Sequence, residues 1–368
     1  MPATPTPAAH HGPTRRAFLA GTGAVAAATL APTALSRAAA PPTSDRDVLV
    51  LIHLRGGADG LSLCIPYGDP NYARLRPVET PTTPGIGVPP PGAPNGCIPL
   101  DSFFALPPAM GALKPIFDAG HLAIVHAVGS PDDSRSHFNA QRYMDSALPA
   151  ESESETGWLG RHLATVDPRD PSAALRAATF GHALPPVLAG GAGWAAMPDS
   201  ANPDTSTPLA RSLKNASTLI RTQPGLETLF IEMGGWDTHS EQGVLRGTMA
   251  RSMSDLATSL KTFYDETIIG ARANVTLVVM SEFGRTLAPN RLNGTDHGRA
   301  GAMFLIGRNI TGGRVLASWP GLAPDQAALP ATIDFRDILA EILAKRMDST
   351  NLAAVFPGYT PTFRNIAV

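Results

Sequence analysis

The chain of 368 residues is close to electrically neutral, with 29 Lys and Arg, 31 Asp and Glu, and a formal net charge of -2. This balance gives no electrostatic reason to expect a nucleic acid or an anionic membrane surface as a partner. Hydrophobic residues make up 43% of the chain, enough for a large core, while 35 glycines and 36 prolines predict long ordered loops and argue against a helical bundle.

The N-terminal segment is typical of an export signal. Arg15 and Arg16 precede an Ala-rich apolar run, and Ala38-Ala39-Ala40 supplies a cleavage site of small residues. Paired arginines before a weakly hydrophobic run indicate the twin-arginine (Tat) pathway. We therefore expect residues 1–40 to be a removable Tat signal peptide and the Tat export machinery to be a partner. The mature protein is then periplasmic or extracellular, with no lasting membrane anchor.

The mature part, residues 41–368, is predicted to be a single domain. Short apolar runs followed by glycine and polar residues predict strands at 47–53, 122–126, 229–233, 275–280 and 303–306. Apolar residues at helical spacing predict helices at 107–119, 138–146, 244–266 and 333–345. Continuously apolar strands that alternate with helices predict an α/β fold with a doubly wound, mostly parallel sheet and helices on both faces.

A Pro/Gly-rich segment at about 79–99 is predicted to be a surface loop. The two cysteines, Cys64 and Cys97, flank most of it. In an oxidising compartment they either pair across the loop or remain free thiols, and both alternatives stay open.

Polar residues gather where the predicted strands end, which is where open α/β sheets bind ligands. Carboxylates and imidazoles at such an edge suit a divalent metal ion, namely Zn, Mn, Mg or Ca, and we expect one or two ions. For each residue taken alone, a turn or a solvated loop is the alternative. The candidate metal ligands are Asp59, Asp237, His239, Glu282, Asp296 and His297.

The segment before the predicted helix at 138–146 suits the binding of an oxyanion. A serine at a helix N-terminus lies in positive potential, and an arginine fork holds a tetrahedral anion. In the alternative reading, Asp133 or Ser134 only caps the helix. The candidate catalytic residues are Ser136, Ser134, Arg135, His137 and Arg285.

Several motifs together resemble the bacterial DUF1501 family across nearly the whole mature chain. They are L-R-G-G-A-D-G-L from Leu54, S-R-S-H-F-N-A-Q from Ser134, G-G-W-D-T-H from Gly234, S-E-F-G-R-T from Ser281, and D-H-G from Asp296. The family looks like a branch of the alkaline phosphatase-like superfamily, which includes alkaline phosphatases, arylsulfatases and cofactor-independent phosphoglycerate mutases. The resemblance implies an alkaline phosphatase-like fold.

The resemblance also implies roles for single residues. Asp59 corresponds to the first metal ligand, and Ser136 (or Ser134) to the nucleophile. Asp237 and His239 resemble an Asp/His ligand pair at shorter spacing, Glu282 corresponds to a further acidic ligand, and His297 to the final histidine. Phe283 stands where another histidine ligand is expected, so the chain either binds one ion or recruits Asp296. No arginine completes the sulfatase signature after Cys64, so a formylglycine nucleophile is not expected.

The sequence thus predicts an exported metal-dependent hydrolase or transferase that acts on phosphate or sulfate esters through a serine nucleophile. Its substrate would be a small-molecule or glycan ester. Phe283 motivates the alternative, a non-catalytic metal- or ligand-binding protein with the same fold and a degraded site.

Overall fold

The computed structural model describes residues 46–80, 82–149, 152, 154–181, 183–197, 207–270 and 274–368. These residues all fall within the unit Ala38–Val368. The predicted signal peptide at 1–40 lies outside the described residues. Among the residues that are described, no helix is long and apolar enough to cross a membrane.

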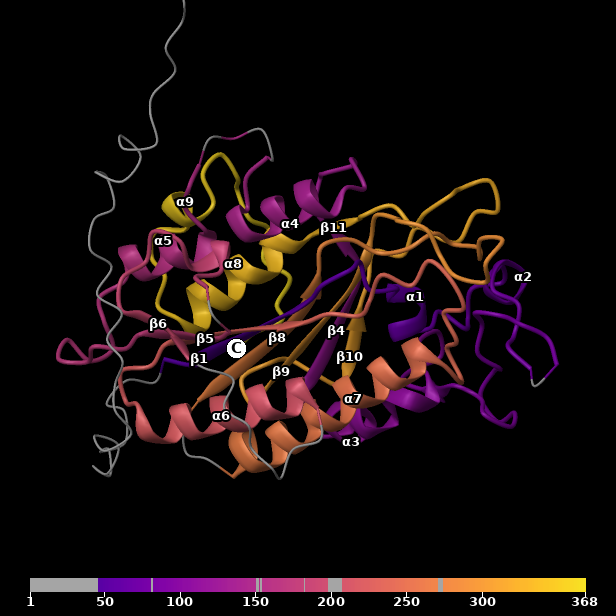
Figure 1. The fold of residues 1–368 in the computed structure, drawn as a ribbon, viewed down its shortest axis with the longest axis horizontal. Helices are drawn as coiled ribbons and strands as arrows, with labels where there is room; N and C mark the ends of the chain where they lie inside the picture. Colours follow the sequence, from indigo (N-terminus) through magenta and orange to yellow (C-terminus); the bar gives the residue numbers. More distant parts are fainter. Residues whose placement is uncertain are drawn as a thin grey trace, which may run out of the picture. The chain divides into compact units, whose positions relative to one another are not determined.

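A nine-stranded sheet carries the fold, and its strands are ordered β10-β4-β9-β8-β1-β7-β5-β6, with β11 beside β4 (Figure 1). All its pairings are parallel except those of β9, which runs antiparallel to both β4 and β8. The strands are β1 (Val48–Leu54), β4 (Leu122–Gly129), β5 (Ala177–Phe180), β6 (Trp194–Met197), β7 (Thr228–Met233), β8 (Val275–Ser281), β9 (Gly301–Gly307), β10 (Arg314–Leu316) and β11 (Ile333–Asp334). A separate two-stranded sheet pairs β2 (Ile98–Pro99) with β3 (Ala105–Leu106).

Helices cover both faces of the large sheet (Figure 1). One face carries α3, α6 and α7, and the other carries α4, α5, α8 and α9. The helices are α1 (Gly60–Leu63), α2 (Tyr72–Leu75), α3 (Lys114–Asp118), α4 (His137–Ser146), α5 (Trp158–Thr165), α6 (Pro208–Thr222), α7 (Thr248–Phe263), α8 (Phe335–Arg346) and α9 (Leu352–Val355). Short 3₁₀ helices η2 (Pro108–Leu113) and η3 (Pro186–Leu188) and a π-helix η4 (Tyr264–Ile269) complete the set.

Strand β1 explains why the sheet needs helices on both faces. All of its residues are buried. Val50 and Ile52 pack into the core beneath α6 and α7, whereas Leu49 and Leu51 pack into the core beneath α5 and α8. Successive side chains of a strand point to opposite faces, so a continuously apolar strand must be covered twice. The predicted doubly wound, mostly parallel α/β fold is confirmed.

The five predicted strands and the four predicted helices are all present, with local differences. The helix expected at 107–119 is divided into η2 and α3, because Pro115 has no backbone N–H to continue one regular helix. The described residues of the loop at 79–99 are not wholly at the surface, since Ile86 and Val88 are buried in the core. Cys64 and Cys97 are buried free thiols.

His162 in α5 is a buried histidine, and neither of its ring nitrogens has a hydrogen-bond partner in the described part of the chain. Burial, reinforced by the charges of Arg176 and Arg46, lowers its pKa from 6.5 to about 4. The unfolded chain therefore binds a proton between pH 6.5 and pH 4 that the folded chain refuses. The stability contributed by neutral His162 is complete above pH 6.5 and is lost as the pH falls towards 4.

We predict that His162→Leu reduces this acid lability. Between pH 7 and pH 4.5 the wild type should lose about 2 kcal/mol more free energy of unfolding than the variant, at 1.36 kcal/mol per pH unit. Urea unfolding of both proteins at the two pH values measures the difference. Parallel losses in the two proteins would contradict the assignment.

Candidate metal centre

Segments next to four strands, β4, β7, β8 and β9, bring polar side chains to one edge of the sheet. Asp237 and His239 lie on the loop after β7, and Glu282 directly follows β8. His137 is the first residue of α4, the helix that follows β4. His297 precedes β9, and because β9 is antiparallel its beginning lies at the same edge as the ends of β4 and β8.

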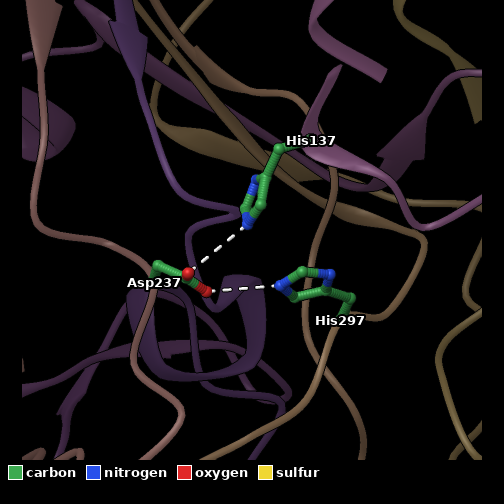
Figure 2. A group of neighbouring side chains, drawn as sticks. All are labelled: His137, Asp237 and His297. Atoms are coloured by element: carbon green, nitrogen blue, oxygen red, sulfur yellow. Dashed lines mark hydrogen bonds and ion pairs between the residues drawn. The ribbon is translucent and has the colours of Figure 1, made fainter. Parts of the chain in front are cut away.

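Three histidines and one aspartate meet at this edge. His239 Nε2 lies 3.0 Å and His297 Nε2 lies 3.3 Å from Asp237 Oδ1. His137 Nε2 lies 3.5 Å from Asp237 Oδ2, and the two imidazole Nε2 atoms of His239 and His297 are 2.9 Å apart. Figure 2 shows His137 and His297 directed at the Asp237 carboxylate from different elements. Ligand atoms of His137, Asp237 and His297 all lie within 4.8 Å of one another, close enough to share one ion.

The other ring nitrogen of each histidine is fixed by an acceptor. His137 Nδ1 donates to Glu282 Oε1 at 2.9 Å, and His239 Nδ1 donates to Asp296 Oδ1 at 3.1 Å. His297 Nδ1 donates to the backbone carbonyl of Arg135 at 2.8 Å. Acceptors of this kind put the proton on Nδ1 and leave the Nε2 lone pair free, which is the usual arrangement around metal-binding histidines.

The arrangement fits a metal ion. Two Nε2 lone pairs that face each other at 2.9 Å repel unless a cation lies between them. His137 Nε2 is buried and has no hydrogen-bond partner among the described residues. Donor atoms of a tetrahedral zinc site lie about 3.3 Å apart when the metal–nitrogen distances are about 2.0 Å. The distances from the Asp237 oxygens to the three Nε2 atoms, 3.0 to 3.5 Å, fall around that value, and the ligand atoms of His137, Asp237 and His297 lie within 4.8 Å of one another.

Asp237 is held from behind by Arg285. The Arg285 guanidinium is buried and donates to Asp237 Oδ1 at 2.5 Å. Partial burial raises the pKa of Asp237, but the hydrogen bond and charge of Arg285 and the neighbouring histidines outweigh burial and lower it. Arg285 also donates to the carbonyls of Gly57, Thr295, Gly56 and Trp236. Arg285 was predicted to bind a substrate anion, but in the structure it lies behind Asp237 and holds that carboxylate in place.

Glu282 lies beneath His137 and outside the group of facing ligand atoms. Its Oε1 accepts from the Gly56 N–H at 2.8 Å and from Gln141 Nε2 at 3.1 Å, in addition to His137. Burial raises the pKa of Glu282, but the hydrogen bonds, those of Gln141 and His137 among them, outweigh burial and lower it. The carboxylate is therefore ionised and orients the His137 ring.

Phe283, which stands where a ligand histidine was expected, packs against two of the imidazoles. Its ring centroid lies 4.9 Å from that of His137 and 4.9 Å from that of His297. The side chain is buried. Phe283 thus removes one ligand and fixes the planes of two others.

Asp59 was predicted to bind metal, and the structure gives it a different cation. Its fully buried carboxylate forms a two-pronged ion pair with Arg76, with N–O distances of 2.5 and 3.0 Å. Ser62 and Gln242 donate to the same carboxylate at 2.6 and 2.7 Å. Burial raises the pKa of Asp59, but Arg76 and these donors outweigh it and lower the pKa. The guanidinium thus supplies the positive charge that a metal was expected to supply.

This buried ion pair supports the ligand loops through Gln242. The Gln242 carbonyl oxygen accepts from Thr238 Oγ1 at 3.0 Å and from Thr295 Oγ1 at 2.7 Å. Thr238 lies between Asp237 and His239, and Thr295 begins the Thr295-Asp296-His297 segment. Gln242 therefore ties the two ligand-bearing loops to each other and to Asp59.

The remaining predicted residues lie around the cluster. Asp296 is exposed and contacts His239, and hydrogen bonds from Asn290 and His239 lower its pKa. Ser134 is exposed, with its hydroxyl bonded to Asp132 and to the Ser136 N–H. Ser136 is half-buried at the start of α4 and makes no capping bond with its side chain. Arg135 contributes its carbonyl to His297, while its side chain is exposed.

Fold and site together define a doubly wound α/β protein with a His/Asp cluster, able to hold a metal ion, at the edge where the parallel strands end. Residues 198–358 match the model of the family described as "Protein of unknown function (DUF1501)". The family resemblance drawn from the motifs is thereby confirmed over this segment. No protein with a curated description matches the sequence.

Two solved structures show a distant likeness in fold. The phosphoglycerol transferase GacH of Streptococcus pyogenes, in complex with sn-glycerol-1-phosphate, has a TM-score of 0.41 at 10% identity, over 88% of this chain and 83% of its own. The alkaline phosphatase of the Antarctic bacterium TAB5 has a TM-score of 0.38 at 8% identity, over 81% of this chain and 98% of its own. At these identities a likeness transfers no activity, so the chemistry follows from this chain's own side chains.

We predict that His297→Ala lowers the metal content of the purified protein from one equivalent to well below a tenth after dialysis. The variant removes the imidazole whose Nε2 lies against both Asp237 and His239, and a site with fewer protein ligands releases its ion more readily. Elemental analysis measures the result. His121→Ala serves as the matched control, because His121 contacts Tyr264 on another part of the fold. Equal metal in wild type and His297→Ala would refute the site.

For Asp59 we predict a loss of stability without a loss of metal. Asp59→Asn strands the buried Arg76 charge, which should cost about 3 kcal/mol of unfolding free energy. The double variant Asp59→Asn/Arg76→Leu should recover part of that loss, because it leaves no lone buried charge. Denaturant unfolding measures the stability of the variants, and elemental analysis measures their metal content. Loss of the metal at unchanged stability would instead show that Asp59 is a metal ligand.

Proposed function

We propose that the protein is an exported, metal-dependent hydrolase or transferase that acts on phosphate or sulfate esters through Ser136. One observation carries the proposal. Three imidazole Nε2 atoms, each fixed by an acceptor on Nδ1, converge on one carboxylate at the ligand-binding edge of the sheet. Structural histidines rarely have this arrangement, whereas metal-binding histidines usually do.

The donor set favours zinc over magnesium or calcium. His137, His239, His297 and Asp237 offer three nitrogens and one carboxylate, and imidazole suits zinc better than the hard cations that prefer oxygen. A single ion is favoured, since Arg76 already neutralises Asp59. When bound, the ion supplies a Lewis acid that lowers the pKa of a nearby hydroxyl and neutralises charge on the ester.

Ser136 is the favoured nucleophile of the two serines. It immediately precedes His137, and its hydroxyl is not used to cap α4. The first N–H groups of that ten-residue helix create a positive potential that stabilises the charge of an attacking oxygen and of the ester. The Ser134 hydroxyl, in contrast, is engaged by Asp132 and by the Ser136 N–H. The exposed Arg135 is available to bind the ester's oxygens.

In the proposed reaction the Ser136 hydroxyl loses its proton to solvent and Oγ attacks phosphorus or sulfur in line with the leaving oxygen. The ester bond breaks, and the leaving oxygen takes a proton from water and departs as the alcohol. Water or a second alcohol, such as a glycan hydroxyl, then takes the group from the serine. The first acceptor makes the protein a hydrolase and the second a transferase. Glu282 holds the proton on His137 Nδ1 throughout, which keeps Nε2 directed at the site.

Export before the reaction is part of the proposal. Arg15 and Arg16 would direct the chain to the Tat machinery, which transports folded proteins, and the predicted destination is the periplasm or the exterior. A protein that must hold a metal among loops from separate strands benefits from folding before transport.

We predict that Ser136→Ala lowers kcat on an aryl phosphate or aryl sulfate at least a thousandfold while the metal content stays at the wild-type value. Ser134→Ala is the matched control and should retain most of the activity. A screen of phosphomonoesters, phosphodiesters and sulfate esters with added divalent metals measures it. Full activity in Ser136→Ala refutes the nucleophile. A wild type with stoichiometric metal and no turnover would favour the non-catalytic metal-binding alternative.

A further inference from the structure

The site as described lacks a buried cation that faces the ligand. Two arginines were expected to serve, Arg135 and Arg285. Arg285 is fully buried and committed to Asp237 and to four backbone carbonyls. Arg55, at the end of β1, is paired with Glu232 and Asp145. The exposed Arg135 is thus the one arginine of these three that is left to bind the ester, and a second guanidinium would match a further charged oxygen.

Arg299 lies at the edge of the sheet that carries the cluster. It follows His297 by two residues and precedes Gly301, the first residue of β9. Its backbone is pinned to the site, because the Gly284 N–H donates to the Arg299 carbonyl at 2.9 Å and the Gly298 N–H donates to the Gly284 carbonyl at 2.8 Å. Gly284 in turn follows Phe283, whose ring packs against His137 and His297.

The Arg299 side chain carries a buried hydrogen-bond donor that lacks an acceptor among the described residues. The residue is half-buried, and its Nε atom is buried with no hydrogen-bond partner among the residues that the structure describes. No acidic residue in the described part of the chain forms an ion pair with it. A buried N–H of a charged group is costly to leave unpaired, so it indicates a partner that is absent from the folded chain alone. The guanidinium fork matches the oxygens of a phosphate or sulfate group.

We propose that Arg299 is a substrate-binding residue that holds an oxyanion of the phosphate or sulfate ester beside His297. The proposal rests on the proposed function for its substrate class. It assigns Arg299 the role that the sequence assigned to Arg285. The residue acts on binding and leaves the metal untouched.

The test is the binding of inorganic phosphate to the purified, metal-containing protein, measured by isothermal titration calorimetry. Arg299→Gln should weaken phosphate binding roughly ten- to a hundredfold, which is the range for a lost charged hydrogen bond. Arg299→Lys should fall between wild type and Arg299→Gln, since a point charge remains and the fork is lost. Elemental analysis should find the same metal content in each variant, which separates a lost contact from a damaged fold.

Arg308 provides the matched control, because it follows β9 directly while Arg299 precedes it. Arg308 is exposed and lies at the opposite end of the strand. Arg308→Gln should bind phosphate as the wild type does. Three results would each overturn the proposal. They are wild-type phosphate affinity in Arg299→Gln, an equal loss of affinity in Arg308→Gln, and no phosphate binding by the wild type.

Together with the ester screen described above, these binding measurements distinguish this inference from the proposed function. A wild type that binds phosphate through Arg299 but turns over no ester refutes the enzyme and retains the anion site. If the wild type turns over aryl phosphates and Arg299→Gln binds phosphate with unchanged affinity, the enzymatic proposal stands and the binding role of Arg299 is refuted.

Discussion

The buried ion pair between Asp59 and Arg76 is the contact on which the stability of the loops around the cluster depends. Both side chains are excluded from water, and each N–H and oxygen of the pair is matched by a specific partner. Arg76 donates to the carbonyls of Thr286 and Leu287, and Asp59 accepts from Gln242. The pair therefore connects the ends of β1 and β8 with the loop that carries Asp237 and His239. Breaking either half strands a charge in the core.

Carboxylate and carbonyl oxygens orient the three histidines so that their Nε2 atoms can bind a cation. Glu282, Asp296 and the Arg135 carbonyl each accept from a different Nδ1, and so each decides which nitrogen faces the centre. Phe283 fixes two ring planes, and Arg285 fixes the carboxylate. The cluster is preorganised because its neighbours fix the orientation of its donors and which ring nitrogen of each histidine faces the centre.

Strand direction decides which residues meet. Parallel strands bring the segments after β1, β4, β7 and β8 to one edge, and the antiparallel β9 brings the segment before it to that same edge. His297 and Arg299 join the site for this reason. Were β9 parallel, both residues would lie at the far end of the sheet, and Arg308 would lie beside the cluster.

The strands, the doubly wound class and most members of the cluster could be predicted from the amino-acid sequence, because apolar runs and polar residues at strand ends are local signals. It assigned Asp237, His239 and His297 to a metal site, and the structure brings them together. Three features follow from tertiary contacts alone: His137 joins the cluster, Asp59 pairs with Arg76, and Arg285 lies behind Asp237. Those contacts join segments that are far apart in the sequence and form only when the strands and loops pack together. Gln242 joins residues far apart in the chain, and no spacing in the sequence encodes such a contact.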